Sequence, residues 1–548
     1  MAKPEYKPLL YTTTMRNPER LKFMLYVLSK FKGQILNDVL ATKIVGETIR
    51  YGLYRPMKQS ESIKRKWSST SSGTFSEYIL TDEEVNYMLE ENPQQHKEAG
   101  FSNGFPSRFA TIYDLTKEMG LAYFKPQRAI VISELGEHLL KSFNVNVCGN
   151  EIMYELINPE YEQQVFLQAM AKSQRKNPFV RVLNDNIPLI LLLQTIKMLN
   201  ADPKQNGAGI SRRELPLLMF WKDNNAKSLY KRIVQLRKDY GYNPSDETII
   251  EICIEEIMEG NYKKFNPKSI IVDYPDELIR KMRITGLISL RGAGRFVDIN
   301  KNEEDKVEYV INKYANYSSF TDEIAYFNHI ATLDKNLIEI KAKPVTPNNA
   351  EKLLTNWLNQ YAWDVIKKEL SILSSGGTSK DSVLKLIAAP SRLEFLTALA
   401  IKSKIPNVRV LPNYSCDDEG LPTSTAGGNK GDIECYEHQK GILVEVTMAT
   451  GRQQTIMEIW PIERHLTDFQ KERKAQCVFI APSIFADSKR QINFVRSDSN
   501  GEKEIRPYAI NEFVNFLENS QCLYVNQTYA NNDSPYSIAA ESPAPYGE

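Results

Sequence analysis

GDIECYEHQKGILVEVT, residues 431–447, is the stretch that predicts the character of the C-terminal part of the chain. Within it, residues 432–436 and 442–447 alternate polar and apolar side chains, and a polar turn ending in glycine separates the two runs. This alternation is typical of two adjacent β-strands joined as a hairpin. One face of the second strand is expected to be buried, and it carries Ile442, Val444 and Val446.

Acidic side chains gather on the other face of this predicted hairpin. Because side chains alternate across a strand, Asp432 and Glu434 share a face of the first strand, and Glu445 and Thr447 share a face of the second. Carboxylates brought together from neighbouring strands repel, and a hard divalent cation such as Mg²⁺ relieves that repulsion with oxygen ligands. The pattern favours a metal-dependent site, and the alternative is a solvated hairpin face without chemistry.

Two further acids strengthen the hypothesis of a metal site. Glu394 stands at the start of an amphipathic helix, and Glu458 follows Glu445 at the same sequence distance that separates Glu445 from Asp432. Each has a structural alternative. Ser391 and Glu394 have the spacing of a capping box, in which the glutamate only caps the helix, and Glu458 is alternatively a charge on a helix surface. Four acids are thus expected around one small α/β unit.

The composition is that of an ordinary globular chain, and 548 residues allow about two to four domains. The net charge of +1 excludes no partner, because basic and acidic regions cancel in the total. Residues 202–240, for example, hold nine Lys or Arg against four Asp or Glu. Six cysteines without CxxC spacing predict reduced thiols, no zinc site and a cytoplasmic location. No segment has the length and apolarity that predict a membrane span.

The N-terminal two-thirds of the chain begins with predicted framework helices. A helix over residues 18–33, capped by Asn17, is followed by a second helix over 37–52. Residues 55–72 are expected to form a basic, Ser-rich loop. Its charged side chains either meet DNA phosphates or remain solvated, and they are Lys64, Arg65 and Lys66.

Two segments show the order of helix, strand, turn and strand that is typical of a winged helix. The first covers residues 108–141. The second begins with one helix over 210–221, bent at Pro216, continues with a basic helix over 226–240, and ends with a helix and two strands over 276–300. Such a unit places one helix in the major groove of DNA, although a helix with a wing also occurs in protein-binding modules. The candidate contacts, each of which is alternatively a solvated helix charge, are Arg212, Arg213, Lys227, Lys231 and Arg232.

The last part of the chain predicts an α/β arrangement around a mixed sheet. Residues 408–412 and 477–482 are expected to add strands to the hairpin, with helices between and after them. Residues 302–380, which include a helical run over 351–373, are expected to connect the two parts. Residues 526–548 lack core-forming side chains and predict a disordered tail.

Taken together, these residues resemble a known family. The C-terminal acids resemble the core of a PD-(D/E)XK nuclease, and the chain is similar to the AlwI family of type IIS restriction endonucleases, which includes site-specific nicking enzymes. The likeness extends from about residue 9 to about residue 519, and it includes LLYTTTMRNPERL at 9–21 and IRYGLYRP at 49–56. Its acidic order is Glu394, Asp432, Glu445 and Glu458, with Gly451, Gln454, Arg464 and His465 between and after them.

The resemblance implies a role for each of the four acids. Asp432 corresponds to the motif Asp and Glu445 to the motif (D/E), and both would hold Mg²⁺, for which Mn²⁺ is a substitute. Glu394 and Glu458 would hold a second ion, order water or accept a proton. DNA would then be hydrolysed at a fixed distance from a short asymmetric site.

Two positions depart from the nuclease motif. Gly431 replaces the motif proline, which contributes only backbone shape. Thr447 stands where lysine is expected, so the general base is open. Thr447, Gln454 and His465 complete the expected catalytic set, although a lone helix histidine is more often structural.

The family resemblance also implies how the domains are organised along the chain. Residues 1–315 are expected to recognise double-stranded DNA through two winged-helix-like units, 316–380 to form a helical linker and 381–525 to form the nuclease domain. The expected DNA contacts are Arg16, Arg55, Lys64, Arg65, Arg108, Arg128, Arg212, Arg213, Lys227, Lys231, Arg232, Arg291 and Arg295, the last two at a wing tip. Cleavage of both strands would require a transient homodimer or a second subunit.

Three functions are open from the sequence alone. The leading hypothesis is a Mg²⁺-dependent type IIS restriction endonuclease. The second is a strand-specific nicking endonuclease with the same site. The third is a non-catalytic winged-helix DNA-binding regulator, and four converging acids argue against it.

Overall fold

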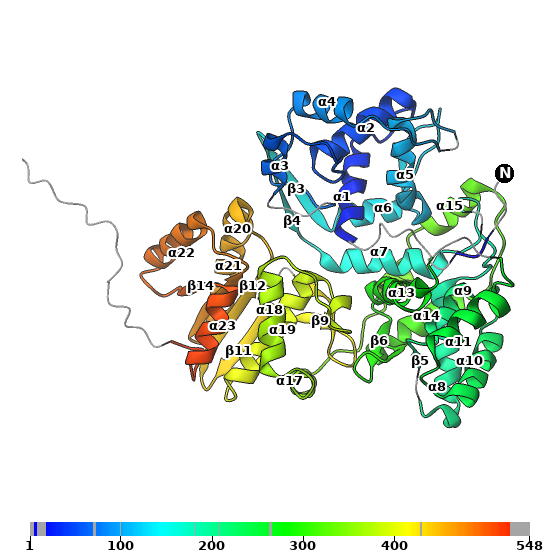
Figure 1. Cartoon of the computed structure of the whole chain (residues 1–548). Coiled ribbons are helices and arrows are strands. Elements are labelled where there is room, and N and C mark those ends of the chain that lie inside the picture. The colour runs from blue at the N-terminus through cyan, green and yellow to red at the C-terminus, as the bar shows by residue number, and fades with distance from the viewer. Residues whose placement is uncertain are drawn as a thin grey trace, which may run out of the picture.

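The computed structural model describes residues 5–7, 18–68, 73–98, 100–180, 182–207, 209–261, 266–427 and 430–525. Arg16, Asn17 and the predicted tail over 526–548 lie outside these ranges. Figure 1 shows an N-terminal part at the top, a middle part at the lower right and a C-terminal part, yellow to red, at the lower left. Within the described ranges, no helix is long and apolar enough to cross a membrane. The cysteines are free thiols.

Helices surround two small hairpins in the N-terminal part. The order expected over 108–141 is confirmed, because α5 leads into an antiparallel pair of strands in which Ala122 faces Ile132. A second hairpin, β3–β4, was not predicted. The elements are α1 (Pro18–Ser29), α2 (Asp38–Arg50), α3 (Glu61–Trp67), α4 (Asp82–Glu91), α5 (Phe105–Glu118), β1 (Ala122–Tyr123), β2 (Val131–Ile132), α6 (Glu134–Leu140), β3 (Phe143–Cys148), β4 (Glu151–Leu156) and α7 (Pro159–Lys172).

The middle part combines helices with a three-stranded sheet of order β5-β7-β6. The basic helix expected over 226–240 is confirmed as α10. The elements are α8 (Pro188–Ala201), β5 (Ile210–Ser211), α9 (Leu215–Phe220), α10 (Ala226–Tyr240), α11 (Asp246–Glu251), the π-helix Ile252–Ile257, α12 (Lys268–Ile271), α13 (Asp273–Ile284), β6 (Ile288–Arg291), β7 (Phe296–Ile299), α14 (Glu304–Tyr314), α15 (Glu323–Ala331) and α16 (Lys335–Glu339).

The prediction of one helix over 210–221 is wrong. Ile210 pairs with Val297 of β7 as a strand residue, and the helix begins only at Leu215. Glu214 fixes the corner between them, because its carboxylate accepts a hydrogen bond from the Ser211 backbone at 2.8 Å and forms a buried ion pair with Arg237 at 2.7 Å. Val297 and Arg237 are distant in sequence from the residues that they contact, which is why local periodicity did not predict the strand.

A five-stranded sheet of order β14-β13-β12-β11-β8 forms the centre of the C-terminal part. The predicted mixed sheet is confirmed, although strand β14 was not predicted. The predicted hairpin is confirmed, because β11 and β12 are antiparallel with Ile433 opposite Val444. Strands β12, β13 and β14 run parallel. The elements are α17 (Pro347–Leu358), α18 (Trp363–Ser374), α19 (Ala389–Lys404), β8 (Arg409–Pro412), β9 (Tyr414–Cys416), β10 (Pro422–Ala426), β11 (Ile433–Glu437), β12 (Lys440–Val446), α20 (Gly451–Met457), α21 (Ile459–Gln470), β13 (Ala475–Ala481), α22 (Ala486–Asp498), β14 (Ile505–Ala509) and α23 (Ile510–Asn519).

Helices cover both faces of this sheet (Figure 1). Ile442 and Val444 belong to one core, whereas Leu443 packs with Ile459 and Ile462 of α21 in a second core on the opposite face. The face of β12 that carries Glu445 is therefore covered as well, and the Glu445 residue is only 6% exposed. The alternative of a solvated hairpin face is wrong.

The region expected to connect the two parts contains two helices in place of the single run over 351–373. The backbone leaves helical geometry after Leu358, and a new helix starts at Trp363. Both helices pack against α19 of the sheet domain. These helices consequently belong, by packing, with the C-terminal part.

Two arginines of the middle part hold the turn between β9 and β10 of the C-terminal part. Arg283 of α13 pairs with Asp417 at 3.0 Å and donates to the Pro422 carbonyl at 2.7 Å. Arg291 of β6 pairs with Asp418 at 2.8 Å and with Glu419. Both the Arg283 and the Asp417 side chains are buried, so this contact fixes how the two parts pack.

Replacing Arg283 by alanine is expected to destabilise the protein by about 3–5 kcal/mol, because Asp417 would remain as an unpaired buried charge. Chemical denaturation followed by fluorescence measures the change. Lys471→Ala is the control, since that lysine forms an exposed pair with Asp468 one helical turn away and its loss should leave stability unchanged. Equal stability of the two variants would contradict a structural role for the buried pair.

Candidate active site

Asp432 and Glu445 meet at one end of the β11–β12 hairpin. Asp432 directly precedes β11, and its Oδ2 accepts a hydrogen bond from the Val446 backbone at 2.7 Å. Glu445 is the penultimate residue of β12. The backbone amide of Val446 thus holds the Asp432 carboxylate across the strand pair, beside Glu445.

Glu394 enters the same site from helix α19. The capping-box alternative is wrong, because α19 begins at Ala389 with Ala388 as N-cap, so Glu394 lies inside the helix. Its residue is 3% exposed, and its Oε2 accepts a hydrogen bond from the Ala426 backbone at 3.2 Å, at the end of β10. The β9–β10 pair, which was not predicted, therefore helps to orient this acid.

Glu458 reaches the site from the junction of α20 and α21. Its Oε1 accepts a hydrogen bond from the Thr447 hydroxyl at 2.7 Å, just beyond the end of β12. The side chain is half-buried. The alternative of a surface helix charge is wrong, and the structure brings Thr447 and Glu458 together.

His465 and Gln454 occupy different places around these acids. His465 on α21 lies with its Nδ1 at 2.9 Å from Glu445 Oε1, so it contacts the predicted motif glutamate directly. Gln454 is buried in α20, where its amide group donates to the Ser483 carbonyl and accepts from the Phe485 backbone, both at 2.9 Å. His465 thus belongs to the site, and Gln454 fixes the loops that support it.

The acids perturb one another electrostatically. Removal from water raises the pKa of Asp432 well above its usual range, and the charges of Glu394, Glu445 and Glu458 raise it further. Burial likewise raises the pKa of Glu394, with a contribution from Glu445. Burial raises the pKa of Glu458 to about 7, against the lowering effect of the Thr447 hydrogen bond. Four carboxyl groups from separate elements therefore form one coupled cluster.

Gly431 allows the close approach of the two strands. A Cβ atom at this position would lie 2.3 Å from Leu443 Cδ1 and 2.9 Å from Glu445 Oε1. A side chain at this position would force the Leu443 side chain to move, and glycine avoids that contact. Glycine lets the backbone approach the glutamate that the site requires.

The donor set fits a hard divalent cation. Asp432 and Glu445 offer carboxylate oxygens beside one another, and the leading charged influences on the pKa of Asp432 are other carboxylates. Across the described ranges, no group of three or more His, Cys, Asp or Glu side chains is already arranged around a metal position. Mg²⁺ is commonly held by one or two carboxylates together with water and substrate phosphate, so a complete protein cage is not required.

The family model of the AlwI restriction endonucleases matches residues 117–375 and 350–516. These segments include most of the chain and all four acids of the cluster. The chain belongs to the AlwI restriction endonuclease family. No curated protein shows a significant match to its sequence.

Solved structures of restriction endonucleases show limited likeness to this AlwI-family chain. The small subunit of the heterodimeric restriction endonuclease R.BspD6I is 25% identical over 27% of this chain and 74% of its own, with a TM-score of 0.23. Restriction endonuclease FokI is 11% identical over 94% of this chain and 96% of its own, with a TM-score of 0.24. The structure of FokI bound to DNA is 11% identical over 92% of this chain and 94% of its own, with a TM-score of 0.20. These scores are low, so membership rests on the family match.

In this AlwI-family chain, the coupled acids make stability depend on pH. Because folding raises their pKa values, the folded protein holds more protons than the unfolded chain above about pH 4, and stability falls as pH rises. Without metal, Asp432→Asn is expected to melt higher than the wild type, with a difference that is small at pH 5 and grows toward pH 8. Each kcal/mol corresponds to roughly 2–4 °C. Calorimetry in EDTA measures it, and a difference independent of pH would contradict the coupling.

Six of the arginines predicted to contact DNA are held by partners inside the AlwI-family chain. Arg232, for example, forms a two-pronged contact to Glu256 at 2.6 and 2.8 Å. The other partners are carbonyls of Gly52 and Trp67 for Arg55, Gln94 for Arg108, Asp276 and the Ser382 carbonyl for Arg212, Asp246 for Arg213, and Asp298, Asp418 and Glu419 for Arg291. The structure thus uses these guanidinium groups to hold its own elements together.

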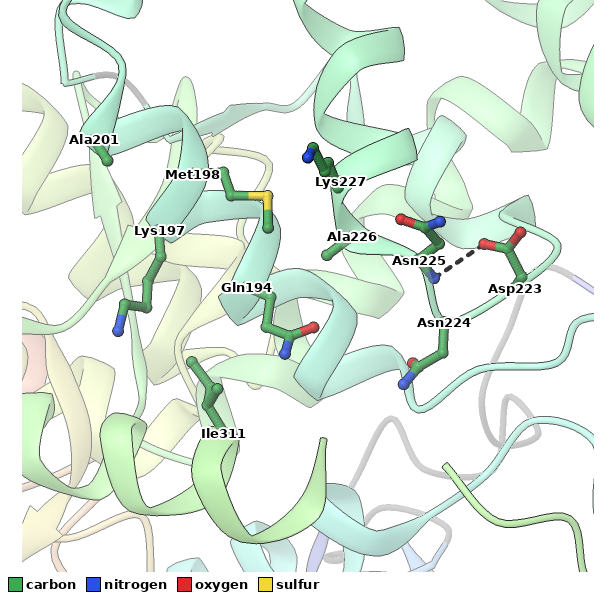
Figure 2. A pocket seen from close by; sticks show the side chains of 10 residues that line it. All are labelled: Gln194, Lys197, Met198, Ala201, Asp223, Asn224, Asn225, Ala226, Lys227 and Ile311. Carbon is green, nitrogen blue, oxygen red and sulfur yellow. Dashed lines mark hydrogen bonds between the residues drawn. The ribbon is translucent and has the colours of Figure 1, made fainter. Parts of the chain in front are cut away.

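The remaining described candidates are exposed. They are Lys64, which pairs with Glu61, and Arg65, Arg128, Lys227, Lys231 and Arg295. Lys227 and Lys231 lie one turn apart on α10, and among the described residues no ion pair holds either. Figure 2 shows that Lys227 also lines a groove of about 840 Å³ beside the start of α10, opposite Gln194 and Lys197 of α8. This end of α10 presents basic and amide groups together.

Proposed function

We propose that this chain is a Mg²⁺-dependent, sequence-specific DNA endonuclease of type IIS behaviour, which hydrolyses phosphodiester bonds at a fixed distance from a short asymmetric site. The observation that carries the proposal is the coupled cluster of Glu394, Asp432, Glu445 and Glu458 at one end of a mixed sheet. A structural role alone gives no reason to gather four acids whose charges oppose one another.

The side chains of the cluster have different proposed roles. Asp432 and Glu445 would hold Mg²⁺, which would supply positive charge to the scissile phosphate and promote attack by water. The Val446 amide fixes the Asp432 carboxylate, and the Ala426 amide fixes Glu394. Glu458, held through one oxygen by Thr447, keeps its second oxygen available to orient the attacking water or to accept its proton.

We assign the parts of the chain to cleavage and to DNA recognition by the positions of the acid cluster and of the exposed lysines on α10. Residues 381–525 are assigned to a PD-(D/E)XK nuclease domain, with the 316–380 linker region next to it. Residues 1–315 are assigned to DNA recognition. The strand order β5-β7-β6 after α8, with α9 and α10 between the strands, supports a winged-helix assignment for the middle part. Lys227 and Lys231 are the proposed phosphate contacts of this unit.

Incubation of the purified protein with supercoiled plasmid and Mg²⁺, followed by sequencing of the product ends, tests the proposal. Discrete ends at a constant offset from one asymmetric motif are expected, and excess EDTA should abolish them while sparing DNA binding. Cleavage that persists in EDTA would overturn the metal-dependent mechanism. An intact plasmid with both Mg²⁺ and Mn²⁺, together with sequence-specific binding, would favour the DNA-binding regulator.

One observation favours strand-specific nicking as a second candidate. Glu394, Asp432, Glu445 and Glu458 form one centre on one chain, and one centre is sufficient to cut one strand. Open circles that accumulate without linear product would establish nicking. Linear product whose rate rises steeply with protein concentration would instead indicate cleavage of both strands by two chains, through a transient homodimer or a second subunit.

A further inference from the structure

The hydroxyl of Thr447 occupies a defined position between the sheet and the fourth acid. Its backbone N–H donates to the Ile480 carbonyl at 3.0 Å, which extends the pairing of β12 with β13 by one residue. Its Oγ1 accepts a hydrogen bond from the Ala449 backbone at 3.0 Å and donates to Glu458 Oε1 at 2.7 Å. Because the hydroxyl accepts from one side, its own proton points toward the carboxylate.

Glu458 depends on side-chain contacts for its orientation. It lies between the two helices, as the C-cap residue of α20 and the N-cap residue of α21, with φ −105° and ψ −46°. The chain between Thr447 and α20 is short, and Gln454 ties it to the rest of the domain through the Ala449 and Ser483 carbonyls at 3.2 and 2.9 Å. The backbone therefore brings Glu458 to the site, and the rotamer of its side chain determines whether the carboxylate faces the other acids.

Like charge opposes that rotation. The carboxylates of Asp432 and Glu445 interact unfavourably with Glu458, so an unrestrained Glu458 side chain would turn away from them. A hydrogen bond to a carboxylate is stronger than one between neutral groups, so a single such bond can hold the rotamer of a half-buried glutamate. Thr447, the residue directly after β12, makes that bond.

We infer that Thr447 is a positioning residue for the cleavage reaction, whose hydroxyl holds Glu458 Oε1 so that Oε2 faces the reacting water. The inference rests on the proposed nuclease function and deepens it. It assigns a task to the position where the nuclease motif would carry lysine: the neutral hydroxyl acts through a carboxylate and supplies no charge itself.

Four variants test the inference: Thr447→Val, Thr447→Ser, Glu458→Gln, and the double variant with Thr447→Val and Glu458→Gln. Valine matches the shape of threonine without its donor, whereas serine keeps the donor. Thr467→Val is the matched control, because that hydroxyl donates only to the Glu463 backbone carbonyl within α21. Single-turnover cleavage of a plasmid carrying the mapped site is measured at saturating Mg²⁺, together with DNA affinity in EDTA and the melting temperature.

Thr447→Val is expected to slow cleavage about 10- to 100-fold, with DNA affinity and melting temperature within about twofold and a few degrees of the wild type. Thr447→Ser should recover most of the rate. The double variant should be no slower than Glu458→Gln alone, because both changes remove the same function. A merely structural threonine would not give this loss of additivity.

Other results would overturn the inference. Thr447→Val with wild-type cleavage, or effects that multiply in the double variant, would show that Thr447 does not act through Glu458. If valine lowers the melting temperature sharply, Thr447→Ala replaces it, and serine recovery of the rate remains the deciding result. A wild-type protein that cleaves no DNA would overturn the nuclease function itself, whereas a cleaving wild type with an equally active valine variant overturns only the positioning role.

Discussion

Asp432→Asn is expected to lower the DNA cleavage rate by about 10³-fold or more while leaving DNA affinity unchanged. The asparagine side chain is nearly the same size and still accepts a hydrogen bond from the Val446 backbone, so the hairpin end keeps its geometry. Only the negative charge that would bind Mg²⁺ beside Glu445 is lost. Cleavage is followed on plasmid with Mg²⁺, and affinity on a short duplex in EDTA.

Asp468→Asn is the matched control for this experiment. Asp468 lies on α21 of the same domain, exposed and paired with Lys471, so its replacement should leave cleavage unchanged. Mg²⁺ should raise the melting temperature of the wild type and of Asp468→Asn, and it should not raise that of Asp432→Asn. Joint loss of cleavage, DNA binding and stability in Asp432→Asn would mean that the acid is structural.

The double change of Lys227 and Lys231 to glutamate is expected to weaken DNA binding about 100-fold at moderate salt. Both ammonium groups are exposed on one face of α10. Reversal removes two phosphate contacts and adds repulsion, and the slope of log affinity against log salt should fall by about 2. Fluorescence anisotropy over a salt series measures both quantities.

Lys352→Glu provides the control for this charge reversal. Lys352 is exposed on α17, which packs on the sheet domain away from α10 in Figure 1. Its reversal changes the net charge without touching the proposed recognition helix. If the α10 variant and this control weaken binding equally, the effect comes from total charge, and α10 does not form the DNA-binding face.

The two predictions separate the tasks of the molecule. Loss of the Asp432 charge should stop chemistry without affecting binding, whereas loss of the α10 charges should reduce binding and leave the acid cluster intact. Arg283 and Arg291 connect the parts that hold these sites, through Asp417, Asp418 and Glu419. This contact would be one physical route between the proposed recognition site and the proposed cleavage site.

Part of the site could be predicted from the sequence, because the alternation of side chains along a strand is a local signal. Alternation over 431–447 predicted the hairpin that places Asp432 and Glu445 together, and the order of four acids predicted the cluster. The basic helix over 226–240 was likewise predicted with the bounds of α10. The hairpin and helix signals depend on neighbouring residues, whereas the four acids were grouped by their order along the chain and by the family resemblance.

The partners of the charged and polar side chains could not be predicted from the sequence. Arg232 and Arg291 looked like DNA contacts in sequence, yet their partners are Glu256, Asp418 and Glu419, which folding brings near. In the sequence, Thr447 was notable only because it replaces the motif lysine. In the structure, its hydroxyl donates a hydrogen bond to Glu458. Periodicity and spacing report which residues can share a face or a helix, whereas the energy of a charge or a hydroxyl depends on burial and on partners that are distant in sequence.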